Sequence, residues 1–285
     1  ISIIVPMGTS KGSTSCSAIV VSIVFSISGR REASSSLVAT SGNLADETIC
    51  TDNIDAISRL GHIADAFLVH NRPIAHHVDD SIVRILAGRP VVLRRARGYA
   101  PLPIITPNDN EPVLAVGGHL KNSIALHNNG FVFISQHIGD LETENSITTL
   151  QHTIADFEEM YDIHPNWVMH DAHPDYVSTR YAHALGRQSM PIQHHKAHVL
   201  SCMADNELEP PVLGVAWDGT GYGDDDTIWG GEFFLVDEQN IRRIAHLRTF
   251  LLPGGDTAIK QPFRSALGLL FEMDSAAFQT FAELP

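Results

Sequence analysis

Two histidines four residues apart are the part of this sequence best suited to chemistry. Gln193–His198 reads QHHKAH, and the apolar spacing after it predicts a helix. His194 and His198 then lie on one helix face, where two imidazoles can hold one metal ion. The pattern is not that of the HExxH zinc proteases, because His195 replaces the glutamate of that motif. At this spacing a histidine pair can also cap or pack a helix.

A second candidate lies where a predicted strand, Val212–Ala216, runs into the sequence WDGTGYG. Asp218 at a strand end can hold a cation, and the glycines that follow leave backbone N–H groups open to phosphate oxygens. Asp224–Asp226 would repel phosphate unless a cation is present, so part of this acidic run is expected to face solvent. With the strand signal Trp229–Leu235, this pattern is typical of the phosphate loop in actin-like ATPases.

Two further turns could bind anions. Gly117 and Gly118 follow the predicted strand Val113–Val116, and Lys121 could supply point charge to a bound phosphate. The next strand, Phe131–Ser135, predicts an antiparallel hairpin rather than a βαβ crossover. Three arginines within Arg94–Arg97 suit a phosphate, which Arg binds in bidentate fashion, but they also fit a solvated strand end.

The elements that must position these residues alternate between strands and helices. Helices are expected at Thr51–Leu60 with Asp52 as N-cap, at Thr148–Tyr161 and at Tyr176–Leu185, and strands at Leu37–Thr40, Ala66–Val69, Val91–Leu93 and Trp167–Met169. Polar clusters follow two of these strands, namely Ser41–Asn43 and His170–Asp175. The segments 100–103 and 106–110 are rich in Pro and Asn, which predicts a linker with a domain boundary near residue 108.

Composition limits the classes of protein. The chain has 285 residues, enough for about two domains, and its 44% apolar and 18% charged content excludes disordered, coiled-coil and collagen-like chains. A net charge of −14 disfavours a nucleic-acid partner. The apolar run Ala18–Ile27 is too short to span a membrane. Three cysteines without a CxxC pair fit a reducing compartment, and Cys202 is interpreted as a packed apolar residue.

Residues 1–36 differ from the rest of the chain. They contain eleven serines and one acidic residue, Glu32, while the other acidic residues all come later. This break indicates a tail, a linker or a segment foreign to the fold, and it is given no assignment.

From about Leu37 to Met273 the sequence resembles the HypF family of hydrogenase maturation carbamoyltransferases. The stretches that carry the resemblance occur in one order: SLVATSGNL, ADAFLVHNRPI, DDSIVR, LRRARGYAPLPI, LAVGGHLKNSIAL, SQHIGDLET, HPDYVSTRYA, QHHKAH, PVLGVAWDGTGYG, TIWGGEFFLVD and RRIAHLRTFLLPGGDTAIKQPFRSALGLL. The resemblance implies a mixed α/β chain. Residues 37–108 would be the end of a YrdC-like nucleotide-binding domain, and residues 109–285 the first lobe of an actin-like (ASKHA) carbamoyltransferase domain.

The resemblance also implies an activity. Carbamoyl phosphate and ATP with Mg²⁺ would give carbamoyl-adenylate, and the carbamoyl group would pass to the C-terminal cysteine of the partner HypE, for cyanide ligands of [NiFe]-hydrogenase. The protein would be cytoplasmic, with no nucleic-acid or membrane partner. The chain ends before the second lobe, where a fourth ligand and the adenosine site would lie, so the chain alone is not expected to be active.

Site residues follow from the same resemblance. His194, His198 and Asp218 match ligands of a bound zinc or iron ion. Lys121, Asn122 and Asp218 are the candidate catalytic residues. The candidate nucleotide-binding residues are Ser41, Asn43, Arg95, Arg97, Gly117, Gly118, Gly219, Thr220 and Gly221.

The sequence departs from the family pattern at three positions. His119 replaces a usual Glu, and His77 and Val78 stand where Arg and Cys are expected. Two other functions remain open. One is a threonylcarbamoyl-type transferase acting on tRNA, which the acidic charge disfavours. The other is a remnant that binds metal or nucleotide without turnover.

Overall fold

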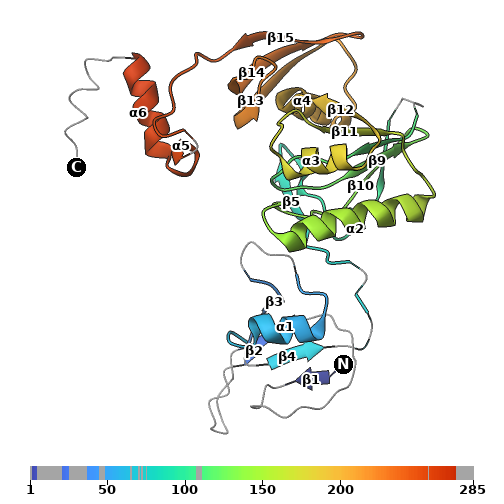
Figure 1. Ribbon diagram of the computed structural model, residues 1–285. Coiled ribbons are helices and arrows are strands. Elements are labelled where there is room, and N and C mark those ends of the chain that lie inside the picture. The colour runs from blue at the N-terminus through green and yellow to red at the C-terminus, as the bar shows by residue number, and fades with distance from the viewer. Residues whose placement is uncertain are drawn as a thin grey trace, which may run out of the picture. The chain divides into compact units, whose positions relative to one another are not determined.

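The computed structural model describes residues 2–4, 21–25, 37–44, 49–64, 66–69, 71, 73–74, 76–106, 111–255 and 257–273. The chain divides into two compact units, Ile1–Pro191 and Ile192–Pro285, each of which is described by itself. Figure 1 labels the helices and strands along the chain. Within the described residues, no helix combines the length and the apolar character needed to cross a bilayer.

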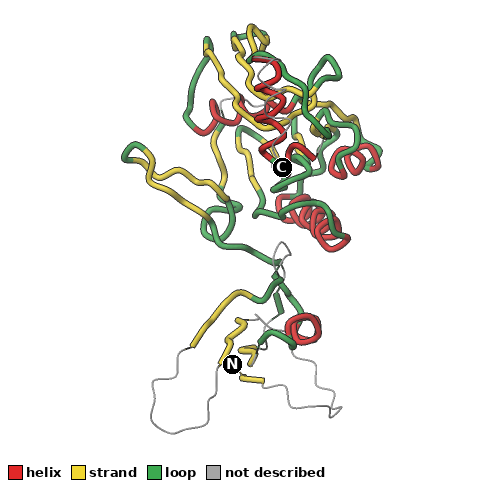
Figure 2. Tube along the Cα trace, turned by 90° about the vertical axis from the view of Figure 1, so that its left-hand side faces the viewer, coloured by secondary structure: helices red, strands yellow, loops and turns green. Residues whose placement is uncertain are grey.

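The N-terminal part of the first unit is a small sheet with one helix. The strand order is β1-β4-β2-β3, and the strands are β1 (Ser2–Ile4), β2 (Val21–Phe25), β3 (Leu37–Ser41) and β4 (Ala66–Val69). Helix α1 (Asn53–Leu60) lies beside these strands in both views (Figures 1 and 2). The predicted N-cap is confirmed, since the Asp52 carboxylate accepts from the Ile54 and Asp55 N–H groups at 2.8 and 2.9 Å. The unassigned segment 1–36 contributes β1 and β2 to this sheet.

The residues interpreted as a linker are partly a strand. The hairpin of β5 (Ile82–Leu86) and β6 (Arg89–Arg94) comes first, and then β7 (Pro103–Ile105) pairs antiparallel with β10 (Phe131–Ile134). The linker interpretation is therefore wrong at Pro103, whereas residues 107–110 of the second linker segment lie outside the described residues. Proline is tolerated at position 103 because β7 is the last strand in its sheet.

The main sheet of the first unit has six strands in the order β12-β11-β8-β9-β10-β7. Its other members are β8 (Val113–Ala115), β9 (Ala125–Asn128), β11 (Trp167–Asp171) and β12 (Gln188–Ile192). The predicted hairpin is antiparallel, but its partners differ, because β9 lies between β8 and β10 and pairs with both. Strand β11 is parallel to β8, so the carboxyl ends of these two strands meet at one edge of the sheet.

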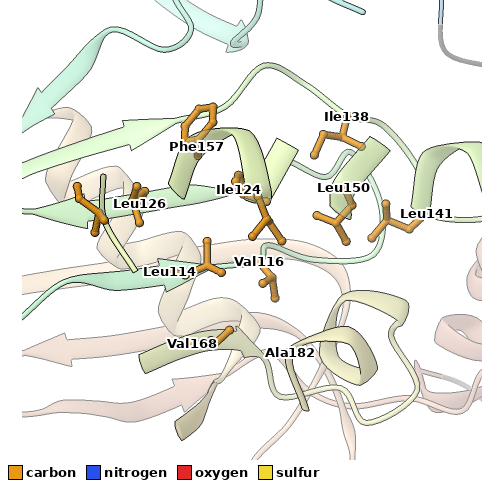
Figure 3. Close-up of a cluster of buried hydrophobic side chains, with 12 residues drawn as sticks. Leu114, Val116, Ile124, Leu126, Ile138, Leu141, Leu150, Phe157, Val168 and Ala182 are labelled. Atoms are coloured by element: carbon orange, nitrogen blue, oxygen red, sulfur yellow. The ribbon is translucent and has the colours of Figure 1, made fainter. Parts of the chain in front are cut away.

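Helices α2 (Glu144–Tyr161) and α3 (Val177–Ala184) complete this unit. Helix α2 begins four residues before the predicted start, because Thr143 and Ser146 form a reciprocal capping box. Buried side chains of the sheet and helices form one core, drawn in Figure 3, with Leu114, Leu126, Leu150 and Val168 all fully buried.

The second unit is a three-stranded antiparallel sheet with a helix on one face. The order is β13-β14-β15, with β13 (Val212–Tyr222), β14 (Ile228–Val236) and β15 (Ile241–His246). Helix α4 (His194–Asp205) packs Val199 and Met203 into the core of this sheet. A side chain at Gly214 would come within 2.4 Å of Val199, so glycine is required for this contact. Helices α5 (Thr257–Lys260) and α6 (Pro262–Met273) follow.

We predict that Leu150→Ala destabilises the main sheet by about 2–5 kcal/mol, because it leaves a cavity in the closed core of Figure 3. Hydrogen exchange of the β8 and β11 amides measures this loss. The control is Met160→Ala on the same helix, whose side chain is 59% exposed and whose removal should cost less than about 0.5 kcal/mol. Equal loss of protection in both variants would contradict the assignment of the core.

Candidate metal centre

His194, His198 and Asp218 converge on one point of the second unit. The Nε2 atom of His194 lies 3.0 Å from Asp218 Oδ2 and 3.2 Å from His198 Nε2, and His198 Nε2 lies 3.7 Å from the same oxygen. Donors at about 2.1 Å from a tetrahedral ion lie about 3.4 Å apart, so these spacings fit one metal ion. Imidazole with carboxylate suits zinc or iron. Among the described residues, these three side chains form a group that could hold one ion, since their ligand atoms all lie within 4.8 Å of one another.

Helix α4 supplies the two histidines as the sequence predicted. The helix begins at His194, so both ligands lie in its first two turns and project from one face. Gln193 is the N-cap, and its side chain accepts from the Lys196 N–H group. Val199 and Met203 pack against the sheet, and this contact determines which face of α4 lies toward β13.

Strand β13 supplies the aspartate through an irregularity, where the sequence predicted a loop. The strand continues to Tyr222, but three of its residues, Asp218–Thr220, lie opposite a single residue of β14, Gly230. Such bulges bend a strand and re-aim its side chains. Here the Gly219 N–H group donates to Asp218 Oδ1 at 2.7 Å, while Oδ2 faces the histidines.

Close packing against the histidines explains why residue 221 is a glycine. A Cβ atom at this position would lie 2.5 Å from the His195 ring and 3.1 Å from His194 Cβ. Gly219 has open space around its Cα, and Thr220 is half-buried between the two glycines. Binding of phosphate by these three residues stays a prediction.

An open pocket of about 230 Å³ adjoins the three ligands. Its lining consists of His198, Val215, Ala216, Trp217 and Asp218, so two of the three ligands border it. Trp217 is 76% exposed and offers an aromatic surface beside the Asp218 carboxylate. The pocket is smaller than the roughly 300–1,000 Å³ typical of drug-sized ligands, and it suits a group the size of a phosphate.

The predicted phosphate turn lies in the first unit and is built around Asn122. Its amide Nδ2 donates to the Val116 and Gly118 carbonyls at 2.8 and 2.6 Å, and the residue is 1% exposed. Gly117 has φ of +70°, and a side chain there would collide with the Ser123 carbonyl. Lys121 is exposed and its N–H group donates to Asp140 at 2.7 Å. Asn122 therefore closes the turn, whereas Lys121 keeps its ammonium group toward solvent.

Three of the remaining nucleotide-binding candidates, Asn43, Arg95 and Arg97, are engaged in local contacts. Asn43 donates to the Leu44 carbonyl at 2.9 Å, and Ser41 ends strand β3. Arg95 donates to the Tyr99 carbonyl at 2.9 Å, and Arg97 donates to the Val78 carbonyl at 3.2 Å. These contacts hold the arginine loop in shape, and nucleotide binding by all four residues stays a prediction.

Sequence reasoning missed a buried ionic group formed by β14 and β15. Glu232 is 2% exposed and accepts from Arg243 Nε at 2.6 Å, and the Arg243 guanidinium lies 3.8 Å from the Trp229 ring centre. Trp229 in turn donates to Asp225 at 2.7 Å. A signal was available, because strand alternation places Glu232 on the same face as the core residue Phe234.

The two described cysteines differ in exposure. Cys202 is exposed, so its interpretation as a packed residue is wrong. Cys50 is buried, and burial, with a smaller contribution from Asp55, raises the pKa of its thiol to about 11. A thiol held protonated at neutral pH is a poor nucleophile.

Comparison with known families agrees with this architecture. The family described as "HypF Kae1-like domain" matches residues 108–205, and the one described as "Carbamoyltransferase, Kae1-like Domain, second subdomain" matches residues 214–284. The Sua5/YciO/YrdC family, described as "Telomere recombination", matches residues 24–96. Together the matches define a protein with a YrdC-type domain followed by a Kae1-like transferase domain.

Individual relatives identify the family. Carbamoyltransferase HypF of Synechocystis sp. is 51% identical over 82% of this chain, and HypF2 of Cupriavidus necator is 42% identical over 83%. A full-length HypF crystal structure in a phosphate- and nucleotide-bound form aligns with a TM-score of 0.81 at 42% identity, covering 87% of this chain and 33% of that one. The crystal structure of T. kodakarensis HypF aligns with a TM-score of 0.78 at 36% identity, covering 84% of this chain and 32% of that one. The chain belongs to the HypF family of carbamoyltransferases, which confirms the resemblance and the mixed α/β fold class. It spans about a third of the length of the curated relatives that it matches, 31% and 30% for the two named.

We predict that the chain binds about one zinc or ferrous ion and that His194→Ala, His198→Ala and Asp218→Ala each weaken binding by at least about 100-fold, since each removes a ligand. Equilibrium dialysis followed by elemental analysis measures this loss. The control is His152→Ala, an exposed histidine on α2. Unchanged affinity in all three ligand variants would contradict the metal site.

We predict that iodoacetamide at pH 8 modifies Cys202 and leaves Cys50 unmodified, because Cys50 is buried and its pKa is raised to about 11. The thiolate fraction of Cys50 should increase about tenfold per pH unit below that pKa. Peptide mass mapping over a pH series distinguishes the two sites. Rapid modification of Cys50 at pH 8 would contradict the buried position.

Proposed function

We propose that the chain supplies the metal-holding part of a carbamoyltransferase of hydrogenase maturation. The reaction uses carbamoyl phosphate and ATP with Mg²⁺ to make carbamoyl-adenylate, and it transfers the carbamoyl group to the C-terminal cysteine of a HypE-like acceptor. The observation that carries the proposal is the convergence of His194, His198 and Asp218 in a chain of the HypF family. One structural relative is a HypF in a phosphate- and nucleotide-bound form, which supports nucleotide use.

His194, His198 and Asp218 would hold the zinc or iron ion. When bound, the ion would supply a Lewis acid that offsets phosphate charge beside the open pocket. The residues around it act by position. Gly219 orients the Asp218 carboxylate through a 2.7 Å hydrogen bond, and Trp217 covers one side of the pocket. Lys121 supplies a positive charge at the turn closed by Asn122, which suits the phosphates of a nucleotide.

Of the two described thiols, the buried Cys50 is unsuited to accept the carbamoyl group. Adenylate is a good leaving group when a thiolate attacks the carbamoyl carbon, but the buried Cys50 thiol, whose pKa is raised to about 11, is protonated at neutral pH. The net charge of −14 supports a protein acceptor over tRNA, whose backbone requires a basic surface. We also propose a cytoplasmic location, because Cys50 and Cys202 are both free thiols.

The test is carbamoyl-phosphate-dependent release of pyrophosphate from ATP. We would compare the 285-residue chain with a version extended at both ends to the length of its relatives. The extended protein should release pyrophosphate and should transfer labelled carbamoyl to a HypE-like acceptor. Asp218→Asn should leave pyrophosphate release nearly intact and reduce transfer by at least about 100-fold, because the ligand belongs to the transferase part.

Each result has a clear meaning. No release by the extended protein would overturn the carbamoyltransferase proposal and favour a remnant that binds without turnover. Release with transfer to tRNA in place of the protein acceptor would favour the threonylcarbamoyl-type alternative. His152→Ala serves as the control for general effects of a histidine substitution.

A further inference from the structure

We propose that Gln193 is a positioning residue of the metal centre. Its side chain holds the first turn of α4 against the end of β13 and so places His194 beside Asp218. This inference rests on the proposed metal site. It adds to that site a residue that touches neither the ion nor the substrate.

The Gln193 side chain is buried and fully engaged. The residue is 4% exposed, and its Oε1 atom accepts from the Lys196 N–H group at 3.0 Å. Its Nε2 atom lies 2.9 Å from the Tyr222 carbonyl and 3.0 Å from His195 Nδ1. One amide group thus links the start of α4, the last residue of β13 and the histidine between the two ligands.

The direction of these hydrogen bonds is fixed by chemistry. A backbone N–H group can only donate and a carbonyl can only accept, so Oε1 must face Lys196 and Nε2 must face Tyr222. Nε2 has two hydrogens, and the second one is donated to His195 Nδ1. The imidazole of His195 therefore carries its own proton on Nε2.

His195 completes the contact from the helix side. Its ring is fully buried and lies where a side chain at Gly221 would be, 2.5 Å from the position of such a Cβ atom. Helix and strand therefore meet at Gly221 and Tyr222, a few residues beyond Asp218. The bulge between Trp217 and Gly221 contains glycine, whose backbone is conformationally free. Pairing of β13 with β14 resumes at Gly221, and the contacts of Gln193 and His195 tie this end of the strand to the helix that carries His194.

A helix-capping role alone does not explain this residue. Ser, Thr, Asp and Asn are the preferred N-caps, and glutamine is not among them. A cap needs only an acceptor, which these shorter side chains supply. Gln193 also donates twice, to Tyr222 and to His195, and those bonds are the ones that reach β13 and the ligand helix.

The decisive variant is Gln193→Glu. It keeps an acceptor for Lys196 but loses both donors and turns an oxygen toward the Tyr222 carbonyl. We expect the zinc affinity of the chain to fall at least about tenfold, the size of effect seen when partners of metal ligands are changed. Competition with a chromophoric chelator measures the affinity, and the visible absorption bands of Co²⁺ should shift. Gln151→Glu, the same change at an exposed site on α2, should alter neither.

A second variant approaches the contact from the strand. Gly221→Ala leaves Gln193 intact but forces His195 away, so it should produce a similar loss of affinity and a similar Co²⁺ spectrum. If Gln193→Glu does not fold, Gln193→Met decides in its place, because it removes the polar atoms at nearly constant volume.

Three outcomes separate the possibilities. Wild-type zinc affinity and Co²⁺ spectrum in folded Gln193 variants would overturn the positioning role. Lower melting temperatures of the metal-free variants with unchanged affinity would reduce Gln193 to a helix cap and would also overturn it. If wild type and His194→Ala bind zinc equally, the metal site itself fails, and the inference fails with it.

Discussion

The metal centre depends on how the first turn of α4 meets the end of β13. His194 and His198 are set by helix geometry alone, one turn apart. Asp218 is set by a strand that gains extra residues just there, so its position relative to the helix is not fixed by sheet pairing. The close packing of His195 on Gly221 and the amide of Gln193 remove that freedom. Three donors from two elements can then lie within 4.8 Å of one another before any ion arrives.

In the first unit, a single buried side-chain amide, that of Asn122, likewise holds a predicted binding turn in place. The parallel pair β8 and β11 brings the turn after Val116 and the loop after Asp171 to one sheet edge. Asn122 closes the turn, and His119 from the turn stacks on Tyr176 from the loop, with ring centres 5.4 Å apart. The histidine that departs from the family pattern at position 119 thus has a structural partner here. A glutamate could not make this ring contact.

Sequence patterns were reliable where one short-range rule decides the structure. The spacing of His194 and His198 predicted a helical pair, and the strand-end position of Asp218 predicted a cation ligand. The family resemblance, not the spacing, joined the three into one ligand set. The glycines after Asp218 predicted a loop, because glycine is common in loops. The same glycines also occur in bulged strands, and the sequence does not show whether a partner strand is present. Pairing with β14 decided otherwise. Strand β9 is too short, at four residues, to show alternation, and Gln193 has no pattern because its partners lie at Tyr222, far along the chain.

Strand β7 lies before the predicted domain boundary near residue 108, but it belongs to the sheet of the following domain. Pro103–Ile105 precede residue 108, yet they cover the outer edge of β10 by pairing with Phe131–Phe133. A transferase domain excised at residue 108 would leave that apolar strand with unpaired N–H and C=O groups, a template for association between copies. Expression of a transferase fragment should therefore start before Pro103, so that the domain keeps its own edge strand.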